Sequence, residues 1–275
     1  MTQVSSLEII RQTKGAVGAF NVILVEHAEA LAEAAEIAQS GTILQISENC
    51  VKYHGSLKAI GVATKAIIES SSQPLSLHLD HAESIDLIKE ALDLGFDSVM
   101  YDGSKLSYRE NVITSKQVAE LCRKYQATIE VELGEVGGKD GVHAPGARTN
   151  PSEAKKFVEE TGVDLLAVAV GTSHGQVTRE AELDFQLIQE LSANVRVPLV
   201  LHGSSGVSDG NLKRAVQSGM RKVNIATHLN HVFTDEIREF LASNPEVVDP
   251  RKYMKKARAS VASETARLIN LLSLK

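Results

Sequence analysis

The sequence has no tryptophan, only two cysteines and only six prolines among its 275 residues. The cysteines, Cys50 and Cys122, share no C-x-x-C spacing, which argues against a disulfide framework and against a zinc site built on thiolates. The 43% apolar and 23% charged residues are typical of globular proteins and exclude the disordered and collagen-like classes. The composition therefore predicts one large folded domain or two small ones.

Long apolar runs and basic clusters are also missing. The longest apolar stretches, such as Asp164–Val170, are far shorter than the ~20 residues needed to cross a bilayer, and residues 1–12 lack a signal-peptide core. Lysine and arginine number 29 against 35 acidic residues, a net charge of −6, and no basic cluster alternates with aromatics. We therefore expect a soluble, cytoplasmic protein that binds neither nucleic acid nor membranes.

Eight short runs rich in β-branched residues alternate with segments of helical periodicity. Gly95, Gly162 and Gly219 each end a helical segment just before the next run, as residues with positive φ do. Eight parallel strands with crossover helices predict an α/β fold, a (β/α)8 TIM barrel rather than an open doubly wound sheet. The runs are Ala16–Val22, Thr42–Ser47, Leu75–Asp80, Asp97–Asp102, Ala127–Leu133, Asp164–Val170, Pro198–Gly203 and Arg221–Ala226.

The remaining segments complete a single predicted domain, residues 1–275. Residues 228–275 contain helical patterns at 232–243 and 254–272 and predict a C-terminal helical extension, with DPRKY between the two helices. The Gly134–Asn150 segment has five glycines and no clear periodicity. A loop of this length within a compact domain is typically functional, and the glycines indicate mobility.

Polar residues gather at the ends of the predicted strands, where barrel enzymes place their chemistry. The third run leads into Asp80 and His81, the sixth into His174, and the seventh into His202. Three imidazoles from three strands suit a divalent metal such as Zn²⁺ with a fourth position open to substrate. Histidines that are simply satisfied by hydrogen bonds are the alternative. Nearby carboxylates could orient the imidazoles, hold a second cation or act as acid and base, namely Asp80, Asp102, Glu130 and Glu132.

Two further segments indicate a phosphate site. GSSG at Gly203–Gly206 follows the seventh run, and NIAT at Asn224–Thr227 follows the eighth. Glycine lets backbone N–H groups approach an anion, hydroxyls add donors, and these two loops commonly hold phosphate in barrels. Taken alone, GSSG would also describe an ordinary turn. Metal and phosphate together indicate a phosphosugar enzyme that uses Lewis-acid chemistry, to which carbon–carbon cleavage beside a ketone is accessible. No predicted strand ends in a rim lysine, which argues against a Schiff-base aldolase.

Seven segments, in order along the chain, carry a family resemblance. They are HLDHAES, SVMYDGS, IEVELGEVGG, DLLAVAVGTSHG, PLVLHGSSG, KVNIATH and DPRKYM. Together they resemble the zinc-dependent class II ketose-bisphosphate aldolases over nearly the whole chain. The resemblance implies reversible cleavage of fructose or tagatose 1,6-bisphosphate to dihydroxyacetone phosphate and glyceraldehyde 3-phosphate, through a zinc-stabilised enediolate.

The resemblance also implies roles for individual residues. The zinc ligands correspond to His81, His174 and His202. Asp80 corresponds to the acid/base at the C4 hydroxyl. Residues that hold the metal in an alternate position, or bind a second divalent ion, correspond to Asp102 and Glu132. The pocket for the dihydroxyacetone phosphate end, where relatives also bind a monovalent cation such as Na⁺ or K⁺, corresponds to Gly175, Gly203, Ser204, Ser205, Asn224, Ile225, Ala226 and Thr227.

Three more residues match substrate contacts of the family. Asn21 and Ser47 lie at the ends of the first two predicted strands. Arg251 matches a basic residue that reaches the distal phosphate from a neighbouring subunit, so the resemblance implies a homo-oligomer, a dimer or a tetramer.

The chain departs from the family pattern at two points. Ala226 stands where some fructose-bisphosphate enzymes have aspartate, as in tagatose-type relatives, which favours tagatose without settling the substrate. In the glycine-rich loop, where relatives carry a glutamate that removes the C1 proton, only Asp140 offers a carboxylate. Either Asp140 or a neighbouring group takes that role.

Other functions remain open at this stage. Lys52 and His54 could add positive charge beside the distal end of the substrate, or belong to a solvated loop, and a different C6 anion such as a sulfonate would also fit. A metal-dependent hydrolase on the same barrel would need no phosphate pocket. A non-catalytic partner subunit is a third possibility, against which Asp80 and the three histidines argue.

Overall fold

The strands of this computed structural model, which describes residues 3–134, 148–175 and 178–275, form a closed barrel. Each strand pairs in parallel with its neighbours in chain order, and the first strand also pairs with the last. The predicted (β/α)8 barrel is confirmed. The strands are β1 (Val17–Asn21), β2 (Thr42–Ser47), β3 (Leu75–Ala82), β4 (Ser98–Tyr101), β5 (Thr128–Leu133), β6 (Leu165–Val168), β7 (Leu199–Leu201) and β8 (Met220–Ile225).

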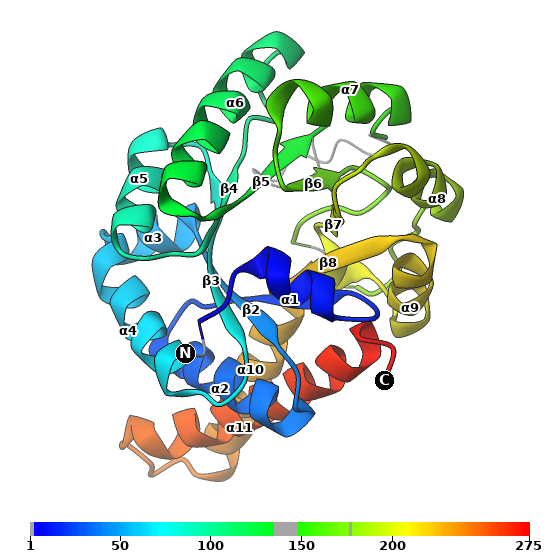
Figure 1. Cartoon of the computed structure of the whole chain (residues 1–275). Coiled ribbons are helices and arrows are strands. Elements are labelled where there is room, and N and C mark those ends of the chain that lie inside the picture. Colours follow the sequence, from blue (N-terminus) through cyan, green and yellow to red (C-terminus); the bar gives the residue numbers. More distant parts are fainter. Residues whose placement is uncertain (1–2, 135–147, 176–177) are drawn as a thin grey trace.

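Helices surround the barrel (Figure 1). Most begin at a serine, aspartate or asparagine whose side chain accepts a backbone N–H of the first turn. The predicted glycine turns are confirmed, with φ of 87° at Gly95, 66° at Gly162 and 127° at Gly219. The helices are α1 (Ser6–Gln12), α2 (Val25–Ala38), α3 (Glu48–His54), α4 (Leu57–Ser70), α5 (Ile85–Asp93), α6 (Tyr108–Tyr125), α7 (Pro151–Thr161), α8 (Phe185–Asn194), η1 (Ser204–Gly206), α9 (Asp209–Ser218), α10 (Thr227–Ser243) and α11 (Pro250–Leu272).

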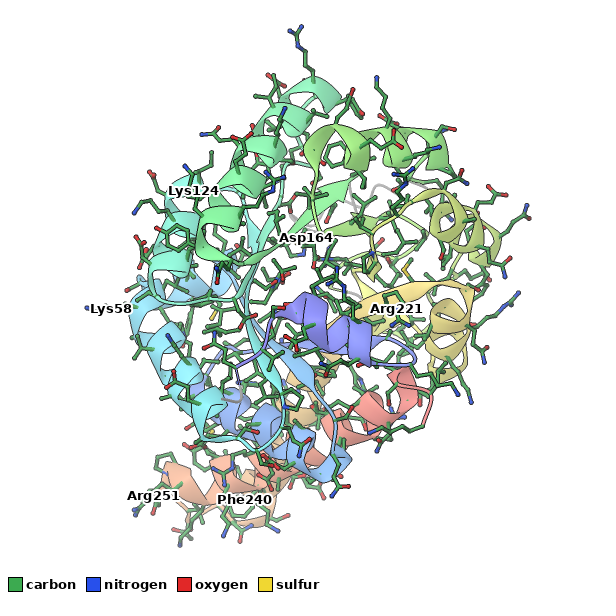
Figure 2. The ribbon with its side chains drawn as sticks, viewed as in Figure 1. Lys58, Lys124, Asp164, Arg221, Phe240 and Arg251 are labelled. Carbon is green, nitrogen blue, oxygen red and sulfur yellow. The ribbon has the colours of Figure 1, made fainter. Side chains whose placement is uncertain are left out.

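Apolar side chains fill the end of the barrel at which the strands begin. Ile9 and Ile10 of α1 pack there against inward-facing strand residues such as Ile43 and Val200. Arg221 ties α1 to β8, because its guanidinium donates to the carbonyls of Ile10, Thr13 and Lys14, and it lies beside α1 in Figure 2. Polar side chains further along the strands therefore face the opposite rim.

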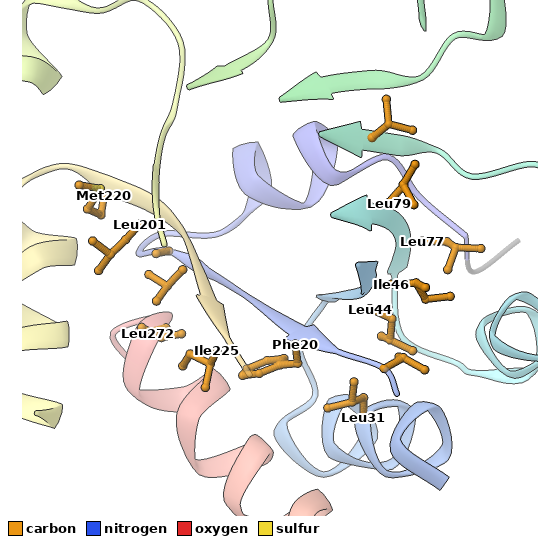
Figure 3. Close-up of a cluster of buried hydrophobic side chains, with 14 of the residues drawn as sticks. Phe20, Leu31, Leu44, Ile46, Leu77, Leu79, Leu201, Met220, Ile225 and Leu272 are labelled. Carbon is orange, nitrogen blue, oxygen red and sulfur yellow. The ribbon is translucent and has the colours of Figure 1, made fainter. Parts of the chain in front are cut away.

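The larger hydrophobic core lies between the strands and the helices. Alternate strand residues point outward into it, including Phe20, Leu44, Leu77 and Ile225 (Figure 3). Each such side chain contributes roughly 1.5–3 kcal/mol when it is fully buried. Because the strand period is two, the residues between these apolar positions point into the barrel, which places the polar ones in its interior.

The C-terminal helix α11 belongs to the helical ring. It packs along α2 and α10 and also contacts α9 and β1, so it covers the junction of the first and last strands (Figure 1). The predicted break at DPRKY is wrong, because α11 already begins at Pro250. Asp249 caps it by accepting the N–H of Arg251, and proline suits the first helical position. Within the described part of the chain, no helix combines the length and apolarity needed to span a membrane.

His27 is a buried titratable group in the first turn of α2. Its Nδ1 accepts the N–H of Leu24 at 3.1 Å, and its ring packs 4.6 Å from Phe233. Burial lowers the pKa of His27 from 6.5 to about 4, so between these values the unfolded chain takes up a proton that the folded chain refuses.

The free energy of unfolding therefore falls as pH drops from 6.5 towards 4. We expect His27→Gln, which keeps an acceptor for the Leu24 N–H, to remove about 3 kcal/mol of this loss. Urea unfolding of both proteins at several pH values measures the difference. Parallel pH profiles would contradict the prediction.

Candidate active site

Three histidine rings converge at the carboxyl end of the barrel. The ring centroids of His81 and His202 lie 4.6 Å apart, those of His81 and His174 4.9 Å, and those of His174 and His202 5.7 Å. One nitrogen of each ring lies within 4.8 Å of a nitrogen of the other two. The predicted trio is thus brought together, in an arrangement able to bind one metal ion.

A bulge in β3 brings both Asp80 and His81 to this rim. Strand alternation alone would turn successive side chains to opposite faces. The pairing of β3 with β4 shifts register between Leu79 and Ala82, and His81 has a φ of 49°, which non-glycine residues rarely adopt. The unusual backbone at His81 lies at the candidate site, where such conformations are often retained for function.

Two carboxylates orient two of the imidazoles. Asp102 lies 2.9 Å from His81 Nδ1, and Glu130 lies 2.9 Å from His202 Nε2. If each carboxylate accepts an imidazole N–H, His81 Nε2 and His202 Nδ1 present lone pairs to each other at 2.9 Å. Two lone pairs at this distance repel unless a cation lies between them, so the donor set fits a metal ion.

A second group of possible ligands adjoins the first. Oxygen atoms of Asp102 and Glu132 and a nitrogen of His81 lie within 4.8 Å of one another, and both carboxylates are buried. His81 is common to the two groups. The geometry therefore offers an adjacent position for an ion, as expected for these two carboxylates.

Asp80 is held by two side-chain amides. Asn224 Nδ2 lies 3.2 Å from Oδ1 of Asp80, and Gln45 Nε2 lies 3.3 Å from Oδ2. Gln45 also donates to Asn21 Oδ1 at 2.6 Å. Hydrogen bonds from two amides fix the orientation of the carboxylate. Gln45 is a site residue that was not predicted, although alternation along β2 places it on the inner face.

These groups share one cavity of about 350 Å³ at the rim. Such a volume suits a small phosphorylated metabolite. Of the predicted site residues, those that line the cavity are Asn21, Ser47, Asp80, His81, Asp102, His174, Gly175, His202, Gly203, Ser204, Ser205, Asn224, Ala226 and Thr227. The predicted metal and phosphate elements thus meet in a single space.

The loops after β7 and β8 are locked together at one end of this cavity. Gly203 has a φ of 65°, and a Cβ there would lie 2.7 Å from the backbone of Ser173, so only glycine fits. Ser204 Oγ donates to the carbonyl of Asn224, and Ser205 Oγ accepts the N–H of Ala226 at 3.3 Å. These contacts fix the two loops beside the cavity, where further backbone amides could bind an anion.

Comparisons with known proteins agree with this geometry. The model of the family described as "Fructose-bisphosphate aldolase class-II" matches residues 2–275. The chain belongs to the class II fructose-bisphosphate aldolase family. Members of this family generally use a divalent metal, and the His, Asp and Glu groups described above are candidate ligands for one.

Individual relatives match nearly the full length of this aldolase family member. The chain is 38% identical over 260 residues to the D-tagatose-1,6-bisphosphate aldolase subunit GatY of Klebsiella oxytoca, and the match covers 93% of this chain and 91% of that one. The crystal structure of the YdjI aldolase from Escherichia coli K12 has a TM-score of 0.84 at 27% identity, covering 98% and 97%. A fructose-bisphosphate aldolase from Campylobacter jejuni, 23% identical with a TM-score of 0.81 and coverage of 98% and 95%, supports the fold alone.

Three predicted residues of this family member do not line the cavity, and a fourth lies outside the part of the chain that the structure describes. Glu132 is fully buried and belongs to the second ligand group. The side chain of Ile225 points outward into the core, because it alternates with Asn224 (Figure 3). Arg251 is 89% exposed at the start of α11 and pairs with Asp249 (Figure 2). Asp140 lies outside the described residues.

Proposed function

We propose that this chain is a metal-dependent aldolase that reversibly cleaves a ketose 1,6-bisphosphate to dihydroxyacetone phosphate and glyceraldehyde 3-phosphate. The observation that carries the proposal is the meeting of the histidine trio, Asp80 and the GSSG and NIAT loops around one cavity. A metal-dependent hydrolase on the same barrel would not need the phosphate pocket formed by the two loops. Membership of the aldolase family supports the same reaction.

The proposed metal is Zn²⁺, held by His81, His174 and His202, because three imidazole nitrogens are typical of catalytic zinc. When bound, the ion supplies Lewis-acid stabilisation of negative charge on the substrate oxygens. Asp102 and Glu132 provide the alternate position or the site of a second divalent ion.

Asp80 is the proposed acid/base. In cleavage it removes the proton of the C4 hydroxyl, and in condensation it returns that proton to the aldehyde oxygen. Gln45 and Asn224 hold its two oxygens, which keeps the carboxylate aimed into the cavity. In condensation a second base must remove a C1 proton from dihydroxyacetone phosphate, and Asp140 is the proposed residue for that step.

The loops after β7 and β8, together with Gly175, are the proposed binding site of the dihydroxyacetone phosphate end. The loop residues are Gly203 to Ser205 and Asn224 to Thr227. A monovalent cation such as Na⁺ or K⁺ is proposed to bind beside the phosphate. Asn21 and Ser47 line the same cavity and are proposed substrate contacts. Ala226 and the similarity to a protein named for tagatose 1,6-bisphosphate favour the tagatose sugar. A C6 sulfonate in place of the distal phosphate stays an alternative.

The distal phosphate is proposed to meet Arg251 of a neighbouring subunit in a homo-oligomer. Arg251 stands at the start of α11, at the far end of the α10–α11 pair, and does not line the cavity of its own chain (Figure 2). Since the related GatY protein is named a subunit, a non-catalytic partner role remains the second candidate. A cytoplasmic location stays a prediction.

A coupled assay of dihydroxyacetone phosphate release tests the proposal. We expect cleavage of tagatose 1,6-bisphosphate, and more slowly of fructose 1,6-bisphosphate, that a chelator abolishes and added Zn²⁺ restores. Release of inorganic phosphate without carbon–carbon cleavage would indicate a hydrolase. No release from either sugar or from a C6-sulfonate analogue, by protein shown to contain metal, would favour the non-catalytic role.

A further inference from the structure

Beneath the candidate metal site lies a layer of charged side chains that the proposed reaction does not use. Lys222 on β8, Glu130 on β5 and His202 at the end of β7 are all fully buried in the barrel interior. Lys222 Nζ donates to Glu130 Oε2 at 2.7 Å, and the other oxygen, Oε1, lies 2.9 Å from His202 Nε2. Each carboxylate oxygen of Glu130 thus contacts one of these two side chains.

Neither Lys222 nor Glu130 lines the cavity formed by the described residues. On their strands they precede Asn224 and Glu132 by two positions, so they lie one layer deeper than the rim. The amine of Lys222 is engaged by Glu130 in this layer, which places it out of reach of a substrate carbonyl. The hydrogen bonds of this pair reach the candidate site at His202.

The buried charges of this layer balance each other. An unpaired carboxylate or ammonium group in a barrel interior is unfavourable, whereas a hydrogen-bonded pair is tolerated. Burial, followed by the nearby Lys222 charge, holds the pKa of His78 well below its usual value, so His78 supplies no countercharge. Its Nδ1 is bonded to Ser98 Oγ at 2.7 Å instead. Lys222 is thus the cation that balances Glu130.

We propose that Lys222 and Glu130 are positioning residues that determine which nitrogen of His202 faces the metal. Lys222 fixes one oxygen of the Glu130 carboxylate, and the other oxygen then accepts the Nε2–H of His202. The lone pair of His202 Nδ1 is left to face His81 Nε2, 2.9 Å away. The inference rests on the proposed metal site and adds the interior groups that orient one of its ligands.

Metal affinity of the apo-protein is the direct measure of this role. Zn²⁺ is titrated in competition with a chelator into the wild type, Lys222→Met, Glu130→Gln and the double variant. Loss of an outer-shell partner typically weakens metal binding about 10- to 100-fold, and we expect that range for each single variant. Lys58→Met, at an exposed position of α4, is the matched control and should bind as the wild type does (Figure 2).

The double variant separates a positioning role from general damage. It removes both buried charges, and the glutamine oxygen can still accept the Nε2–H of His202. We expect it to bind Zn²⁺ more tightly than either single variant and to unfold at a higher temperature as apo-protein. The visible spectrum of bound Co²⁺ should be altered in Lys222→Met and closer to the wild type in the double variant.

Several outcomes would overturn the inference. One is wild-type affinity in Lys222→Met; another is a double variant whose loss equals the sum of the single losses. If Lys222→Met does not fold, the double variant is used for the test instead. A folded double variant without measurable metal binding then contradicts the proposal. A wild-type protein that binds no metal would refute the proposed metal site, whereas normal wild-type binding with unaffected variants refutes only the positioning role.

Discussion

Replacing Asp80 with asparagine should lower kcat for ketose-bisphosphate cleavage by about 100- to 10,000-fold, the contribution typical of a general acid/base. The amide has nearly the shape of the carboxylate but cannot take the C4 hydroxyl proton. Bound metal should stay at the wild-type level, because Asp80 lies beside the histidine trio without belonging to either ligand group. Steady-state kinetics and metal analysis of the same preparation measure both quantities.

A matched control lies on the same strand–helix unit. Asp86 is exposed in the first turn of α5, and Asp86→Asn should leave both kcat and metal content unchanged. Loss of metal in Asp80→Asn would indicate that Asp80 is a structural residue or a metal ligand. Retained turnover would contradict its proposed role as acid/base.

Replacing His202 with alanine should weaken metal binding, which the Asp80→Asn substitution should leave unchanged. It removes one of three imidazole ligands and leaves Glu130 without one of its two partners. Because an outer-shell partner alone is worth about 10- to 100-fold in affinity, we expect loss of this ligand to weaken Zn²⁺ binding by more than about 100-fold. Chelator competition measures the affinity, and activity should fall with occupancy.

His231→Ala is the corresponding control, because His231 is an exposed histidine on α10. It should bind Zn²⁺ with wild-type affinity. The proposed ligand set would be contradicted if His202→Ala kept stoichiometric metal through gel filtration and bound Zn²⁺ with wild-type affinity.

The sequence predicted the strands well because their apolar runs and the glycine turns between them are local signals. Each of the eight predicted runs overlaps a strand, although β3 and β8 extend beyond their runs, and the β2 bounds, Thr42–Ser47, agree at both ends. Prediction of the C-terminal region was weaker. The cap that starts α11 depends on the Asp249 side chain reaching the N–H of Arg251, a local contact that the polar DPRKY pattern obscured.

The sequence indicated Glu130 as one of several carboxylates near the histidines, but it did not indicate Lys222, which lies in the middle of a strand rather than at its end. In TIEVEL, and in KVNI at the end of β8, polar residues alternate with apolar ones, which is enough to place Glu130 and Lys222 on one face of each strand. Alternation could not show that the two side chains meet. Their strands are three apart around the barrel, and the pairing depends on its closure and diameter.

By itself the sequence determined the class of fold and the rim on which the polar residues lie, and it predicted metal- and phosphate-binding chemistry there, because these follow from periodicity and residue type. Only the tertiary structure decided which atoms meet. The bulge that turns His81 to the rim and the outward side chain of Ile225 arise from backbone register, while the Lys222–Glu130–His202 contacts require closure of the barrel. Distant strands come within hydrogen-bonding range only when the whole sheet closes.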